Sequence, residues 1–222
     1  MNTMESNNLS LQQKATTDDI ININYWKEVH KEINSLLKQL RGIILLTHNS
    51  IEFTDLIDVL KKIKPEHMQT ILYISLVRSY DFMRMALNQK QLNNKKIFFI
   101  DCVSGYAFPE EINIDNCLYH KPPNNLEQMK QLITFGIEKA GPDIIVIDSL
   151  SQFINFTKPT EHELSDLYKF IHELKENALN IMQDTFILLY DTKLGIMQHL
   201  PKLSFNLILK IEIIKEMPRW KD

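Results

Sequence analysis

Glycine, cysteine and long apolar runs are all scarce in this sequence. The chain of 222 residues contains 5 glycines and 2 cysteines. Cys102 and Cys117 are too few and too far apart for a zinc site or a disulfide framework, which points to a reducing, cytoplasmic environment. No apolar run approaches the roughly 20 residues that span a bilayer, and the N-terminus lacks the apolar core of a signal peptide. We therefore expect a cytoplasmic protein without a membrane segment.

A charge excess of one sign is also missing. The formal net charge is -3 and the pI is about 6.2, so no global field attracts DNA or RNA. The composition, 44% hydrophobic and 24% charged, is typical of a globular domain. Residues 1–23 are rich in Asn, Gln, Ser and Thr and are predicted to be a disordered tail. The remaining residues, 24–222, are predicted to form a single domain.

The segment 143–151 gives the clearest strand signal of the chain. A Gly-Pro pair, which cannot continue a helix, precedes it, and four branched apolar residues follow Asp143 without interruption. Such a run predicts a strand covered on both faces, as in a parallel sheet between helices. The strand ends in Asp148 and Ser149. Ligands of open α/β sheets bind outside the carboxyl ends of the strands, so these two residues are the first candidates for chemistry.

The rest of the chain alternates between the two hydrophobic periods. Strands are expected at 43–47, 70–75, 96–101, 144–147, 185–190 and 205–214, with a further short strand at 117–120. Helices are expected at 25–40, 51–63, 79–91, 126–139, 161–178 and 195–200. The alternation predicts a three-layer α/β/α fold with a mostly parallel sheet.

Several more polar residues follow predicted strands. Asp101, Asp191 and His48 each end a buried run, and with Asp148 they would line one rim of the sheet. Three carboxylates and an imidazole suit a hard metal ion, but strand-end aspartates also form turns and cap helices, so both interpretations stay open. Arg78 falls at the same edge, where it either binds an anion or is a surface cation.

A nucleotide site would need a phosphate-binding loop after the first strand. Such loops use glycine amides and a lysine, whereas residues 47–53 read Thr-His-Asn-Ser-Ile-Glu-Phe. Asn49 and Ser50 remain candidate contacts, but Asn49 with Glu52 also predicts a capping box, and Glu52 places a negative charge where phosphate would lie. Each missing charge-assisted hydrogen bond removes about 1.5–3 kcal/mol, whereas millimolar affinity needs about 4 kcal/mol. Tight binding of ATP phosphates is therefore not expected.

The order and character of three strand segments, 71–76, 96–104 and 144–151, resemble the archaeal KaiC-like branch of the RecA superfamily of ATPases. The resemblance covers roughly residues 42–214 and implies a RecA-like P-loop NTPase fold. In active relatives a phosphate loop with Lys and Thr falls at 47–53, and two glutamates that activate water fall just after Ser75-Leu76. This sequence has Val77-Arg78 in the second place. Of the family's functional positions only Asp148, the Walker B acid that holds Mg²⁺, carries over.

The resemblance thus implies a RecA-like domain that has lost hydrolysis. The leading hypothesis is a non-catalytic module, monomeric or dimeric and without a cofactor, which docks on an active ATPase of the same superfamily or on a signalling protein. A sheet edge, the helix at 25–40 or the tail at 215–222 with Trp220 would supply the contact. One alternative is an enzyme or sensor that binds ATP and Mg²⁺ through Asp148, helped by Asp101 and Arg78. Another is an accessory DNA-binding protein that uses the lysines at 61–64 and 95–96.

Overall fold

The computed structural model describes residues 42–49, 51–53, 55–57, 70–89, 97–108, 113–114, 116–157, 161–177, 185–195 and 205–211. Several predictions lie outside the described residues: the tail at 1–23, the helix at 25–40, the lysine segments at 61–64 and 95–96, Ser50 and the C-terminal tail at 215–222. The short helix at 195–200 also lies outside them, apart from Gly195. The single domain over 24–222 remains a prediction.

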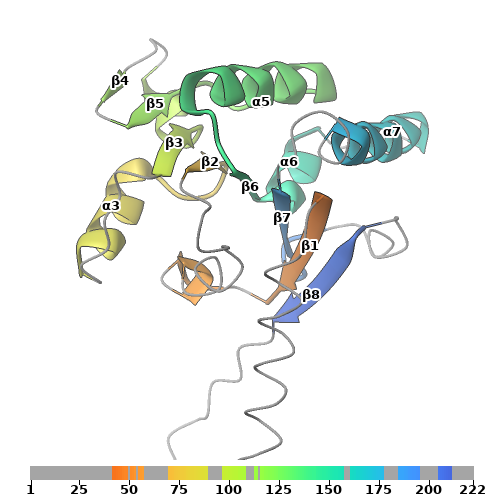
Figure 1. Ribbon diagram of the computed structural model, residues 1–222, viewed down its shortest axis with the longest axis horizontal. Helices are drawn as coiled ribbons and strands as arrows, with labels where there is room; N and C mark the ends of the chain where they lie inside the picture. The colour runs from red at the N-terminus through yellow and green to blue at the C-terminus, as the bar shows by residue number, and fades with distance from the viewer. Residues whose placement is uncertain are drawn as a thin grey trace, which may run out of the picture.

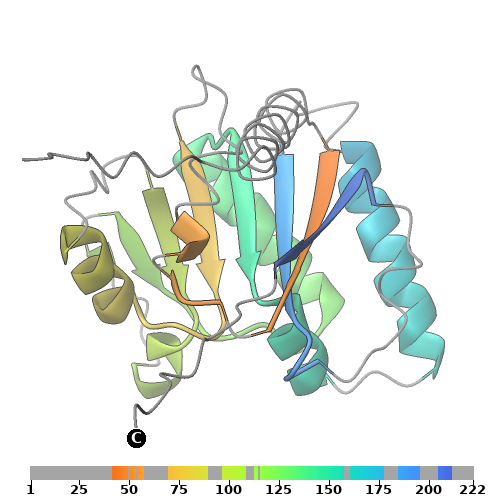
Figure 2. The same cartoon turned by 90° about the horizontal axis from the view of Figure 1, so that it is seen from below.

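One mixed sheet of eight strands forms the centre of the described part of the chain. The strands are β1 (Gly42–His48), β2 (Ile71–Ser75), β3 (Ile97–Asp101), β4 (Asn113–Ile114), β5 (Cys117–Tyr119), β6 (Ile144–Asp148), β7 (Thr185–Asp191) and β8 (Leu207–Ile211). Their spatial order is β4-β5-β3-β2-β6-β7-β1-β8, as Figures 1 and 2 show. Only β4 runs antiparallel, next to β5, and the seven strands other than β4 run parallel to one another.

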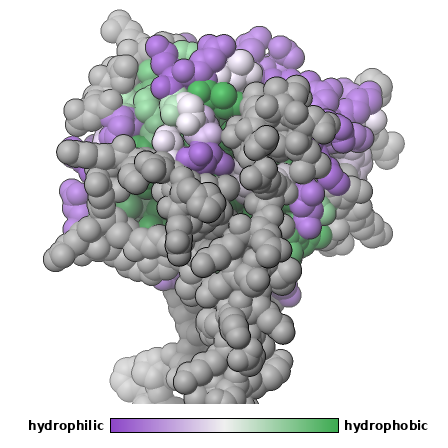
Figure 3. All heavy atoms as spheres, in the orientation of Figure 1, coloured by the Kyte–Doolittle hydropathy of each residue, from purple (hydrophilic) through white to green (hydrophobic). Residues whose placement is uncertain are grey.

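Helices cover one face of this sheet with α5 (Leu126–Ala140), α6 (Leu150–Thr157) and α7 (Glu161–Asn177). Alternate strand residues point to this face, because successive side chains of a strand point in opposite directions. Leu45, Ile147 and Leu188 belong to the same buried cluster as Leu132 of α5 and Phe170 of α7. The outer surfaces of the helices along the top and right of Figure 3 are mainly hydrophilic, which is what helices with one buried face require.

The opposite face packs against α3 (Tyr80–Gln89) and the turn that contains Phe53. Leu46 and Val146 point to this side and share a buried cluster with Phe53 and with Met83 of α3. The three-layer α/β/α arrangement with a mostly parallel sheet is therefore confirmed. Among the described residues, no helix is both long and apolar enough to cross a bilayer.

The predicted elements agree with the observed ones at most positions. The helix predicted from residue 126 begins there, because Asn125 caps it by accepting a hydrogen bond from the Gln128 amide at 2.9 Å. Gly141 ends it in the left-handed conformation, at φ 50°. The last strand begins at Leu207 and not at Phe205, and positions 212–214 of the prediction lie outside the described residues. Helical geometry after β1 begins at Phe53 and not at Ile51.

Three elements were not predicted: α4 (Ser104–Ala107), β4 and α6. Two are too short to show a hydrophobic period, with four residues in α4 and two in β4. The buried residues of α6, Leu150, Phe153 and Ile154, do follow helical spacing, but the helix has only eight residues and follows strand β6 almost directly. So short a period does not set a helix apart from another apolar segment.

Candidate functional site

The candidate residues lie at the carboxyl edge of the sheet. Strand pairing sets Ser75 opposite both Asp101 and Asp148, and it sets His48 opposite Asp191. All five side chains belong to buried residues. The sequence therefore predicted correctly that these residues line one rim, but their contacts divide them into separate groups.

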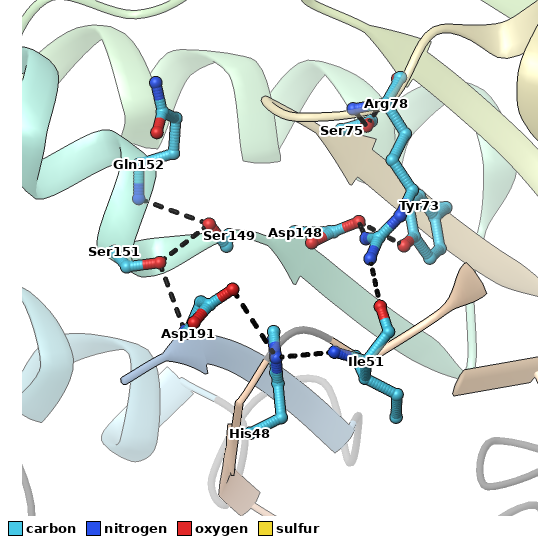
Figure 4. Close-up of polar contacts among 10 residues, drawn as sticks. All are labelled: His48, Ile51, Tyr73, Ser75, Arg78, Asp148, Ser149, Ser151, Gln152 and Asp191. Atoms are coloured by element: carbon cyan, nitrogen blue, oxygen red, sulfur yellow. Dashed lines mark hydrogen bonds and ion pairs between the residues drawn. The ribbon is translucent and has the colours of Figure 1, made fainter. Parts of the chain in front are cut away.

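Asp148 is a buried carboxylate of this rim with two side-chain partners. It is 1% exposed, and its Oδ2 accepts a hydrogen bond of 2.6 Å from the hydroxyl of Tyr73 on the neighbouring strand β2. The same oxygen accepts a hydrogen bond from Nη1 of Arg78, as Figure 4 shows. Burial, followed by the charge of Asp148, raises the pKa of Tyr73 well above its ordinary value, so Tyr73 is a constant donor.

Arg78 is an internal partner of Asp148 and not a surface cation. Its side chain is only 15% exposed, and its Nη2 donates a 2.7 Å hydrogen bond to the carbonyl of Ile51. Burial acts to lower the pKa of Arg78, but the Asp148 carboxylate outweighs it and raises that pKa, so the guanidinium stays charged. The loop that carries Arg78 is fixed by Ser75, whose Oγ accepts from the Arg78 amide and donates to the Arg78 carbonyl. The guanidinium is thus committed to protein partners on two sides.

Asp101 serves the backbone around it. Its Oδ1 accepts from the amides of Val103 and Ser104 at 2.9 and 2.8 Å, and its Oδ2 accepts from the amide of Tyr80 at 2.7 Å. These bonds hold the turn after β3 and the first amide of α3. Of the two interpretations left open by the sequence, the turn-forming and capping one fits this geometry.

His48 and Asp191 meet on the other side of Asp148. His48 Nδ1 accepts a 3.1 Å hydrogen bond from the Ile51 amide, while Asp191 Oδ2 lies 3.9 Å from the same nitrogen. At that distance the second contact is electrostatic and not a hydrogen bond. Burial lowers the pKa of His48 despite the nearby carboxylates, which favours the neutral imidazole. Asp191 Oδ1 accepts from the Lys193 amide at 2.8 Å.

Ser149 and Ser151 form the start of α6. The Ser149 Oγ accepts from the Gln152 amide at 3.2 Å, and the two hydroxyls are 2.9 Å apart. Ser151 in turn accepts from the amide of Asp191 at 3.2 Å, which connects α6 to β7. The contacts of Ser149 are those of a helix cap.

The loop after β1 occupies the position where a phosphate loop would lie. Ile51 and Phe53 are 3% and 1% exposed, and the Phe53 ring packs edge-to-face on Tyr73 at a centroid distance of 5.7 Å. The Ile51 amide donates a hydrogen bond to Nδ1 of His48. These side chains direct the loop into the core beneath the site, so its backbone does not form a cradle open to an anion.

The residues present do not fit a magnesium–nucleotide complex. Among the described residues, no group of three or more His, Cys, Asp or Glu side chains is placed to hold a metal ion, so the predicted set of three carboxylates and His48 does not assemble. The guanidinium of Arg78 already contacts the one Asp148 oxygen that Tyr73 also holds. The pocket at this edge, about 230 Å³, is lined by three acids, Glu52, Asp148 and Asp191, against one cation. Phosphate groups would meet a net negative surface there.

Two residues that shape this site, Tyr73 and Ser151, were missed at the sequence level. Tyr73 occurs inside a buried strand, where a tyrosine reads as a core residue. Ser151 belongs to the unpredicted helix α6. Only the pairing of β2 with β6 and of α6 with β7 reveals their partners.

The architecture is the KaiC-like α/β fold of RecA and P-loop proteins. No protein-family model matches the sequence, and no curated protein matches it. Among the solved structures that match is a KaiC-like protein from the hyperthermophilic archaeon Pyrococcus horikoshii OT3. The two chains superpose with a TM-score of 0.54 at 15% identity, over 80% of this chain and 75% of the other. At that identity the likeness shows the fold alone, and it supports the resemblance inferred from the strands at that level.

Proposed function

We propose that this protein is a non-catalytic RecA-like domain that acts as a protein-interaction or regulatory module. The observation that carries the proposal is the internal pair of Arg78 with Asp148. In the family that the fold resembles, this aspartate serves a magnesium ion; here a side chain of the same chain supplies the positive charge. The charge of the Asp148 carboxylate is balanced by Arg78 without a metal ion, so we propose that no cofactor is required.

The neighbouring loop supports the same conclusion. A phosphate site depends on free backbone amides at a helix start, but the amide of Ile51 is bound to His48 and the side chain of Phe53 fills the core. The rim residues Glu52, Asp148 and Asp191 add negative charge. Loss of the cradle and of the free carboxylate together removes the two interactions on which binding of magnesium nucleotides depends.

A domain that keeps its fold but catalyses no reaction would act by binding another molecule. We propose that the partner is a protein, with an active ATPase of the same superfamily as the first candidate and a signalling protein as the second. Strand β8 is the last strand at one end of the sheet, and its Ile208 is 41% exposed. A strand of a partner protein could extend the sheet next to β8. We further propose that the chain by itself is a monomer or dimer, which light scattering coupled to size-exclusion chromatography measures directly.

The experiment that tests the proposal is calorimetric titration of the full chain with ATP, ADP and GTP in the presence of Mg²⁺, followed by thermal-shift measurements. We expect neither heat nor a shift in melting temperature at millimolar nucleotide. Binding tighter than ~100 μM, about 5.5 kcal/mol, would overturn the proposal in favour of a magnesium-dependent nucleotide binder. An Asp148→Ala variant provides the control, because it must abolish any binding that depends on Mg²⁺ at this carboxylate.

The same preparation tests the DNA-binding alternative. The proposal predicts no retention of single- or double-stranded DNA at low salt. Retention that weakens steeply with added salt would favour the accessory DNA-binding function.

A further inference from the structure

Two residues that line the pocket at the carboxyl edge each have a buried side-chain atom with no hydrogen-bond partner among the described residues. The two atoms are His48 Nε2 and Asp148 Oδ1, and their residues are 4% and 1% exposed. Both residues line the pocket of about 230 Å³. Buried polar groups are nearly always paired, so two orphan atoms on residues that line one pocket indicate a site for an exogenous polar group.

Geometry determines the character of the first atom. Because Nδ1 of His48 accepts a hydrogen bond from the Ile51 amide, Nδ1 carries no proton, and the neutral ring carries its proton on Nε2. His48 Nε2 is therefore a donor that lacks an acceptor. A metal ion bound at Nε2 would force the proton onto Nδ1, where it would face the Ile51 N–H, so the same hydrogen bond opposes metal ligation.

The second atom is an acceptor. Asp148 Oδ2 holds both Tyr73 and Arg78, which leaves Oδ1 of the same carboxylate without a donor (Figure 4). A group that satisfies the pocket must therefore accept from His48 and donate to Asp148. Carboxylates have no proton to donate at neutral pH, and the negative charge of both carboxylates and phosphates is repelled by the net negative lining of the pocket. A simple ammonium group has no acceptor for His48.

We infer that this pocket binds a neutral primary carboxamide, whose carbonyl accepts from His48 Nε2 and whose amino group donates to Asp148 Oδ1. The volume is below the roughly 300–1,000 Å³ of sites for drug-sized ligands, so the pocket takes a group of a few non-hydrogen atoms. That group belongs either to a small free amide or to an asparagine or glutamine side chain of a partner protein. The inference shares the residues His48 and Asp148 with the proposed function, but the ligand would bind to Nε2 and Oδ1, two atoms that the proposed function does not use.

The test is nitrogen-resolved NMR of the His48 imidazole in the full chain during titration with acetamide and, separately, with acetate. The two probes have nearly the same shape, and only acetamide carries both donor and acceptor. We expect the free protein to show the proton on Nε2, and acetamide at concentrations up to roughly 0.1 M to shift the Nε2 resonance saturably. Acetate and inorganic phosphate should leave it in place. The imidazole of His172, whose side chain is 72% exposed, reports non-specific solvent effects.

Two further arms complete the design. The first arm repeats the titration with N-acetylglutamine methylamide, which imitates a glutamine residue of a partner protein. Binding at least tenfold tighter than that of acetamide assigns the site to a partner's side chain, and equal or weaker binding assigns it to a free small amide. His48→Phe should weaken either amide at least tenfold, while the shift assay on the wild-type chain remains decisive if that variant does not fold. A proton on Nδ1, a shift by acetate or phosphate, or no shift by acetamide overturns the inference. If acetamide causes no shift, the proposed function is unaffected. The proposed function is overturned by binding of magnesium nucleotides, which is measured separately.

Discussion

Replacing Arg78 by methionine should reveal how strongly the internal ion pair stabilises this fold. Methionine is shorter than arginine, but it keeps a flexible apolar stem and removes the guanidinium with its charge. The carboxylate of Asp148, 1% exposed, then keeps only the Tyr73 hydroxyl as a partner. An unpaired buried charge of this kind costs about 3–5 kcal/mol in free energy of unfolding.

Two independent considerations give the same range. A pair of unit charges about 4 Å apart interacts by about 4 kcal/mol at the effective dielectric constant of partly buried sites. The hydrogen bond from Arg78 to the Ile51 carbonyl adds about 1 kcal/mol. For a chain of this size each kcal/mol lowers the melting temperature by about 2–4 °C, so the variant should melt roughly 6–20 °C below the wild type.

Urea unfolding and calorimetric melting measure this loss, and Arg84→Met provides a matched control. Arg84 pairs with Asp81 on α3, but their side chains are 48% and 69% exposed, so we expect a loss of only about 0.2–1 kcal/mol. Asp148→Asn combined with Arg78→Met should restore part of the stability, because the amide leaves no buried charge. An Arg78→Met variant no less stable than the Arg84→Met control would refute the internal-pair interpretation.

Three other variants probe the remaining structural assignments by the same urea unfolding assay. Asp101→Ala leaves three backbone amides without their acceptor and should lower the free energy of unfolding by about 3–5 kcal/mol. The control is Asp166→Ala, whose side chain is 45% exposed and whose loss should cost less than about 1 kcal/mol. Equal losses in the two variants would contradict the capping role of Asp101. Gly105→Ala should be far more harmful than Gly141→Ala: at the first site a Cβ meets a backbone carbonyl at 2.0 Å, while the second site has free space and only a positive φ, worth about 1 kcal/mol. Burial holds the pKa of His48 below its ordinary value of 6.5, so the imidazole takes up a proton at a higher pH in the unfolded chain than in the folded one. The free energy of unfolding should therefore fall as the pH drops from about 6.5 towards the folded-state pKa, by at most about 1.4 kcal/mol per pH unit. His48→Asn should remove that part of the pH dependence, and an unchanged profile would show that His48 is not its source.

The sequence by itself determined the layers of the fold. Continuous apolar runs such as 144–147 need cover on both faces, and the alternation of such runs with helix periods allows few arrangements other than a parallel sheet between helices. It also determined that strand ends bring His48, Asp101, Asp148 and Asp191 to one rim, because parallel strands share a carboxyl edge. From the absence of glycines after β1 we also predict that no glycine-rich phosphate loop forms there, and the nucleotide titrations test that prediction.

Only the tertiary structure decided what these polar residues do. Arg78 and Asp148 are 70 positions apart, and Tyr73 and Asp148 are 75 apart, so no local pattern could pair them. The pairing arises because β2 lies beside β6, an order that hydrophobic periodicity does not encode. Burial makes Arg78 an internal partner and favours the neutral form of His48, and it comes from the packing of distant segments. This packing places an internal ion pair beside a small polar pocket.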